Sequence, residues 1–74
     1  FSFQKNRDLA IREFKNAIRI DPEFDLPYYY TGIQYFNSHP SISKNNLKKF
    51  LMLSSKKPEN QNLVFKARKL LEKL

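Results

Sequence analysis

The sequence predicts an all-α fold built from four helices. Apolar residues recur at steps of three and four throughout the 74-residue chain, which is the spacing of one face of an α-helix. Prolines and short polar runs divide this pattern into four stretches, with breaks near residues 21–25, 37–43 and 55–60. Because the helical spacing continues after each break, no β-strand is expected.

The first helix is predicted over residues 7–20. Its apolar stripe consists of Ala10, Ile11, Phe14, Ala17 and Ile18. Asp21-Pro22 ends the helix, because proline cannot donate a backbone hydrogen bond to the preceding turn and moves the residue before it out of the helical region.

The second helix is predicted to begin at Asp25, with the Asp25 side chain as its cap and Pro27 in the first turn, where a missing amide hydrogen is tolerated. This helix carries the run YYYTGIQYF at residues 28–36, which holds five aromatic rings and the only glycine of the chain. It ends in the segment that precedes Pro40.

The third helix is predicted after Pro40, with Ser41 or Ser43 as its cap, and the fourth over residues 60–74, after Pro58. The apolar stripe of the third helix consists of Leu47, Phe50, Leu51 and Ser54, with Leu53 beside it. The stripe of the fourth consists of Val64, Ala67, Leu71 and Leu74, flanked by Leu63 and Leu70.

A chain of this length allows one small domain with a limited core. It has no cysteine, which excludes disulfides and thiolate metal sites. No apolar stretch approaches the ~20 residues of a membrane-spanning helix, and no segment has the pattern of a signal peptide. Because the chain begins at Phe1, we expect it to be a segment of a longer protein.

Charge is distributed unevenly along the chain. Residues 1–40 hold five basic and five acidic residues, whereas residues 41–74 hold nine basic residues against two acidic ones, Glu59 and Glu72. The whole net charge of +7 therefore belongs to the second half. Such an asymmetry indicates either an anionic partner or ordinary solvated helix faces.

The sequence is similar to itself after a shift of 36 residues. The shift places Phe14 on Phe50, Pro22 on Pro58 and Tyr29 on Phe65. The match spans a helix, the proline that stops it and the next helix, so a two-helix unit is repeated.

These residues resemble a known repeat family. The spacings Ala10-x3-Phe14-x2-Ala17-x4-Pro22 and Tyr28-x3-Gly32-x2-Tyr35, followed by Phe50 and Pro58, resemble the tetratricopeptide repeat, a 34-residue helix-turn-helix unit. The resemblance implies antiparallel helix pairs stacked as a right-handed α-α superhelix. It also implies a single domain over residues 1–74, with residues 1–22 as the second half of a truncated repeat, 25–58 as a full repeat and 60–74 as a closing helix.

Gly32 is predicted to mark a close approach between helices. Glycine inside a helix costs ~1 kcal/mol relative to alanine, so a packing gain is expected to compensate. We expect Tyr28, Gly32 and Tyr35 to face the neighbouring helix, with an aromatic ring such as that of Phe14 or Phe50 against the bare backbone of Gly32.

The resemblance implies that the first helix of each pair lines a concave surface that holds a partner peptide or helix. The residues placed on that surface are Leu26, Tyr29, Tyr30, Ile33, Phe36, Phe65, Lys66, Lys69 and Lys73. Its lysines favour an acidic partner. The alternative for Tyr29, Tyr30, Ile33 and Phe36 is that they pack on neighbouring helices, namely the missing upstream helix and the last helix.

The function implied is a protein-protein interaction scaffold, without enzymatic activity and without a cofactor. His39 has no second histidine or cysteine beside it and is interpreted as a turn residue. Asp21-x-Glu23-x-Asp25 lacks the glycine and the terminal carboxylate of a calcium loop, so no metal site is expected. The alternative function, less favoured, is binding of nucleic acid or an anionic surface through Lys44, Lys48, Lys49, Lys56 and Lys57.

A homo-oligomer or an exchange of helices between copies is a further expectation. The truncated repeat is expected to leave the side of the first helix with Leu9, Ile11 and Ile18 partly uncovered, and so few repeats lie below the number that usually gives stability.

Overall fold

A computed structural model describes the backbone of residues 3–74 and the side chains of residues 8–74. Residues 3–74 form four α-helices and no strand, which confirms the predicted fold class. The helices are α1 (Phe3–Ile20), α2 (Leu26–Tyr35), α3 (Pro40–Ser54) and α4 (Gln61–Glu72), and a short 3-10 helix, η1 (Pro58–Asn60), precedes α4. The helix α1 begins four residues before its predicted start.

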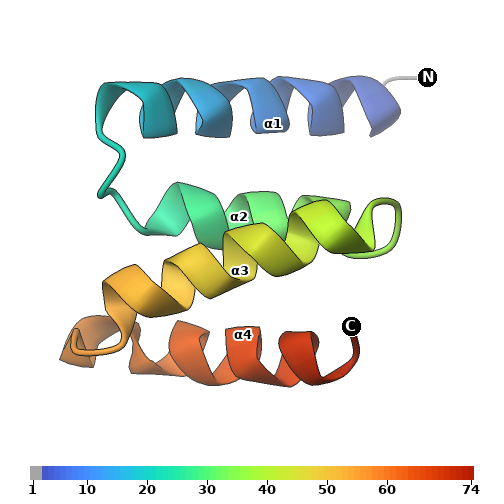
Figure 1. Cartoon of the computed structure of the whole chain (residues 1–74). Helices are drawn as coiled ribbons and strands as arrows, with labels where there is room; N and C mark the ends of the chain where they lie inside the picture. The colour runs from blue at the N-terminus through green and yellow to red at the C-terminus, as the bar shows by residue number, and fades with distance from the viewer. Residues whose placement is uncertain (1–2) are drawn as a thin grey trace.

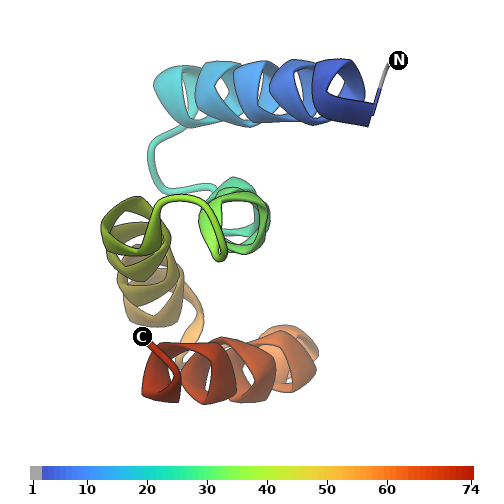
Figure 2. The same cartoon turned by 90° about the vertical axis from the view of Figure 1, so that its right-hand side faces the viewer.

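Consecutive helices run antiparallel (Figure 1). The helices α2 and α3 lie side by side between α1 and α4 (Figure 2), with α1 packed on α2 and α4 packed on α3. The described chain is elongated, with extents of 39 × 30 × 19 Å.

The helix boundaries follow the prolines. The helix α1 ends at Ile20, directly before Asp21-Pro22, and Pro27 lies in the first turn of α2 as predicted. The helix α3 begins at Pro40 with His39 at the capping position, so the prediction of Ser41 or Ser43 as its cap was wrong. Ser43 is instead buried inside the helix pair, where its hydroxyl donates a hydrogen bond of 2.6 Å to the carbonyl oxygen of Gly32.

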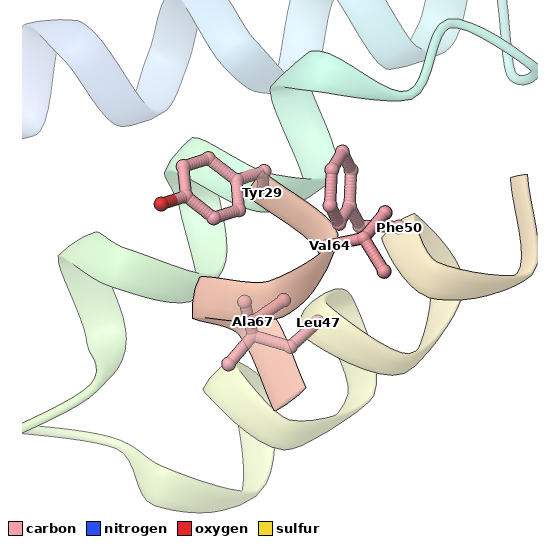
Figure 3. Close-up of a cluster of buried hydrophobic side chains, with 5 residues drawn as sticks. All are labelled: Tyr29, Leu47, Phe50, Val64 and Ala67. Atoms are coloured by element: carbon pink, nitrogen blue, oxygen red, sulfur yellow. The ribbon is translucent and has the colours of Figure 1, made fainter. Parts of the chain in front are cut away.

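One buried cluster joins α2, α3 and α4. It consists of Tyr29, Leu47, Phe50, Val64 and Ala67 (Figure 3). Half-buried leucines of the predicted stripes pack around it, among them Leu51, Leu63, Leu70 and Leu71. Leu47 and Phe50 on α3 and Val64 and Ala67 on α4 are buried, as their predicted stripes require. Leu74, which was placed on the stripe of the fourth helix, lies after the end of α4 and is exposed.

Gly32 lies at the closest approach of α2 and α3, but the side chain that covers it is aliphatic. A Cβ atom added at Gly32 would lie 2.7 Å from both Cγ and Cδ2 of Leu47 and 3.4 Å from the carbonyl oxygen of Ser43. The predicted buried close approach is confirmed, and the expected aromatic ring of Phe14 or Phe50 was wrong. Leu47 fills this space because it lies on the α3 face turned toward α2.

The helix α1 packs on α2 through a ring stack and buried aliphatic side chains. The rings of Phe14 and Tyr30 are stacked with 5.6 Å between their centroids and an interplanar angle of 22°. Of the three α1 residues whose side was expected to be partly uncovered, Leu9 is exposed, Ile18 is half-buried and Ile11 is buried.

Other residues of the repeat pattern secure the turns. The Tyr28 hydroxyl donates a hydrogen bond of 2.8 Å to the carbonyl oxygen of Pro22, which ties α2 to the turn before it. The Tyr35 ring meets the His39 ring edge to face at 5.3 Å, at the turn between α2 and α3. Ala10 and Ala17 are half-buried on α1.

Candidate partner-binding surface

The α2 residues predicted to bind a partner divide into exposed and half-buried side chains. Tyr30 is 41% exposed and Ile33 is 39% exposed, three residues further along the same side of the helix. Leu26 and Phe36, at the two ends of α2, are half-buried. Tyr30 is also held in place by its stack on Phe14, so its ring is an ordered part of this surface.

Tyr29 is not available for partner binding. It is 5% exposed and lies in the buried cluster with Phe50, whose ring centroid is 5.0 Å away. Its placement on the binding surface was therefore wrong, and the open alternative of packing on neighbouring helices holds for this residue. The cause is the adjacent helix α4, which supplies Val64 and Ala67 to the same cluster.

The α4 residues of the predicted surface are all exposed. Phe65 is 62% exposed, and Lys66, Lys69 and Lys73 are exposed as well. The Lys69 ammonium lies 5.4 Å from the centroid of the Phe65 ring, in a cation-π contact. The opposite side of α4 carries the buried Val64 and Ala67, so the helix is amphipathic with one aromatic residue on its polar side.

None of these lysines forms a salt bridge within the described side chains, although Glu72 stands three residues after Lys69 and directly before Lys73. The single salt bridge formed within residues 8–74 joins Lys57 to Asp25, and none involves Lys66, Lys69 or Lys73. Their charge is therefore open to solvent or to a binding partner.

A buried polar cluster that the sequence analysis missed links three segments of the chain. We call it the Asp25 cluster: the Asp25 carboxylate accepts hydrogen bonds from Ser54 Oγ, from Lys57 Nζ at 3.1 Å and from Asn60 Nδ2 at 2.7 Å. Asp25 stands at the capping position of α2 as predicted, but its side chain makes no capping hydrogen bond. The cluster joins the start of α2 to the end of α3 and to η1.

The cluster keeps Asp25 ionised. Burial alone would raise the pKa of Asp25, but the hydrogen bonds from Ser54 and Lys57, together with the Lys57 charge, lower the pKa below its ordinary value. The pKa of Tyr29 is raised, first by burial and then by the neighbouring Tyr30. Neither residue is placed to act as a catalytic acid or base on an open surface.

Two of the five lysines considered for phosphate binding take part in the fold. Lys57 pairs with Asp25, and Lys49 lies over the Tyr28 ring at 6.0 Å from its centroid. Lys44, Lys48 and Lys56 remain exposed on α3 and directly after it.

The described residues show no grouping for metal binding, since no three His, Cys, Asp or Glu side chains among them lie together in a way that could hold an ion. None of the helices in residues 3–74 combines the length and the apolar character needed to cross a membrane.

Comparisons with known proteins give no match: no protein-family model, no curated protein and no solved structure is detectably similar to this chain.

Proposed function

We propose that the chain is a protein-interaction module of the tetratricopeptide type, which holds a peptide or helix of a partner protein against exposed residues of α2 and α4. The observation that carries the proposal is the exposure of Phe65, Tyr30 and Ile33 on the two helices that the resemblance assigns to partner binding. Exposed aromatic and aliphatic side chains held on rigid helices are typical anchors of protein interfaces.

The antiparallel helix pairs support this function, because they fix the side chains that a partner would contact. Tyr30 is stacked on α1, and Ile33 and Phe65 project from helices joined by the buried cluster. A preorganised surface loses little conformational freedom when a partner binds, which favours affinity.

Phosphate binding is the less favoured alternative because the fold engages part of the basic second half. Lys57 is committed to Asp25, and Lys49 is placed over Tyr28. The exposed aromatic residue on α4, which a partner protein can bury, is a feature that phosphate binding alone does not use.

A displayed library of random 15-residue peptides, selected on the immobilised chain, tests the proposal. We expect selected peptides to bind Phe65→Ser and Ile33→Ser at least tenfold more weakly than the wild type, because each change removes an apolar anchor. Met52→Ser is the matched control, since Met52 is 65% exposed on α3 and lies outside the proposed surface. Affinities are measured by fluorescence anisotropy with the purified chain.

Two outcomes would contradict the proposal. If the selected peptides lose as much affinity for Met52→Ser as for Phe65→Ser and Ile33→Ser, or if selection yields only peptides indifferent to all three changes, the surface on α2 and α4 does not bind partners.

A further inference from the structure

From the α4 surface we infer the chemistry of the partner: an acidic amphipathic helix that buries an apolar side chain on Phe65 and pairs its carboxylates with Lys66, Lys69 and Lys73. We call these three residues the lysine ridge. The inference rests on the proposed function and specifies its partner.

The arrangement of the lysine ridge determines the shape of the partner. Its three residues stand at steps of three and four, so they follow one side of α4 over about 10 Å. Acidic residues with the same spacing on a second helix match that row, because both helices rise by the same distance per residue. Phe65 lies one turn before Lys69 on the same side, so an apolar residue of the partner can lie within the row of carboxylates.

In the internal repeat of the sequence, the exposed Phe65 corresponds to a buried residue. The 36-residue shift relates Phe65 to Tyr29. Tyr29 is 5% exposed in the cluster to which α4 contributes Val64 and Ala67, whereas Phe65 is 62% exposed. A partner helix on α4 would cover Phe65 as the packed helices of this chain cover Tyr29.

The charges on α4 distinguish between a second copy of this chain and a helix of a different protein as the partner of α4. The three lysines repel one another and form no salt bridge within residues 8–74, and together with Arg68 they outnumber the one acidic residue of α4, Glu72. A second copy of the chain would bring another net charge of +7, and its first 40 residues carry as many basic as acidic residues. An acidic segment of a different protein is the occupant that these charges favour.

Two synthetic helical peptides of equal length test the inference by fluorescence anisotropy with the wild-type chain. Both carry the same leucine and phenylalanine residues on one side; one carries Glu at steps of three, four and three beside them, and the other carries Gln at the same positions. We expect the Glu peptide to bind at least tenfold more tightly at low salt, and the difference to shrink as salt rises to about 0.5 M, because screening weakens exposed ion pairs.

Variants of the chain test which residues cause the preference for the Glu peptide. Lys69→Gln combined with Lys73→Gln should remove most of the preference for the Glu peptide, and Phe65→Ser should weaken both peptides about tenfold. The charge-matched control is Lys44→Gln combined with Lys48→Gln on α3, whose lysines are also exposed; it should leave both affinities within twofold. Circular dichroism checks that every variant remains helical.

Three results would overturn the inference. The first is equal affinity of the chain for the Glu and Gln peptides. The second is a loss of affinity for the Glu peptide in the Lys44 and Lys48 control as large as in the Lys69 and Lys73 variant. The third is concentration-dependent self-association that is abolished by Phe65→Ser. A library selection that yields uncharged peptides dependent on Phe65 would leave the proposed function intact and remove only the acidic partner.

Discussion

Among single residues, Gly32 has the clearest structural role. The fold needs a residue without a side chain there, because Cγ and Cδ2 of the fully buried Leu47 already occupy the space that a Cβ atom would take. The buried hydrogen bond from Ser43 to the Gly32 carbonyl oxygen adds a second contact at the same point. Close packing of α2 on α3 thus offsets the low helix propensity of glycine.

Replacement of Gly32 is expected to destabilise the fold although it improves helix propensity. Gly32→Ala gains up to about 1 kcal/mol of propensity, but overpacking against Leu47 costs about 1–3 kcal/mol, and Gly32→Leu should cost more. Chemical unfolding measures both variants. In a Leu47→Ala background the cost of Gly32→Ala should fall, since the side chain in conflict is gone. A Gly32→Leu variant as stable as the wild type would contradict this account.

The Asp25 cluster predicts how stability depends on pH. The folded-state pKa of Asp25 is lowered, so its stabilising contribution is present above its ordinary pKa of 3.8 and is lost as the pH falls through the lower folded-state value. We expect the free energy of unfolding to decrease from about pH 5 to about pH 2. Asp25→Asn should lower the free energy of unfolding by about 1–3 kcal/mol at neutral pH, because the hydrogen-bond donors around it lose a charged acceptor. It should also make the decrease in stability between about pH 5 and about pH 2 smaller.

Asp21→Asn is the matched control for this measurement. Asp21 is exposed, and its carboxylate accepts a hydrogen bond of 3.2 Å from the nearby backbone amide of Glu23. If the loss of stability at low pH is unchanged in Asp25→Asn but smaller in Asp21→Asn, the Asp25 cluster is not the source of the pH dependence.

At the scale of helices, the described elements are not equally secured. The helices α2, α3 and α4 share one buried cluster, whereas α1 packs mainly on α2 and contributes no residue to that cluster. The contacts of α1 centre on Ile11 and on the stack of Phe14 on Tyr30. Fewer buried apolar contacts imply a lower free energy of local opening for α1 than for α3.

Hydrogen exchange of the intact chain checks this difference. Backbone amides of α1 in residues 10–20 should exchange faster than those of α3 in residues 44–54, because α1 opens without disrupting the shared cluster. Phe14→Ala should accelerate exchange in α1 and leave α3 nearly unchanged, since it removes the stack on Tyr30 and Phe14 is not part of the shared cluster. Equal protection of the two helices would show that the four helices open as one unit.

At the scale of the whole molecule, exposed large apolar side chains occur on each of the four helices within residues 8–74. On α1 and the turn that follows it they are Leu9, Ile20 and Phe24. Residues 1–40, which include this segment, carry no net charge, whereas residues 41–74 carry the whole net charge of +7. Exposed apolar side chains of this kind favour association between copies.

Self-association through α1 remains a prediction that sedimentation velocity can test. At about 0.15 M salt, where charge repulsion is screened over about 8 Å, the weight-average sedimentation coefficient should rise with protein concentration. Leu9→Ser combined with Ile20→Ser should reduce this rise, and Phe65→Ser should not. A folded monomer at all concentrations would rule out the association.

The sequence determined the local architecture of this protein. Apolar spacing and four prolines were enough to predict four helices, their breaks and the buried faces of α3 and α4, because helix periodicity and proline geometry act over a few neighbouring residues. They also identified Gly32 as a point of close approach and Phe65 and its lysines as an exposed group.

The tertiary structure alone decided which residues meet across the helices. It placed Leu47 on Gly32, buried Tyr29 while leaving Phe65 exposed, and directed the Asp25 carboxylate to Ser54, Lys57 and Asn60. These contacts join residues far apart in the chain, and they depend on the lateral packing and register of one helix against another. The apolar spacing within a single helix does not determine the register between two helices, so these contacts are known only from the folded structure.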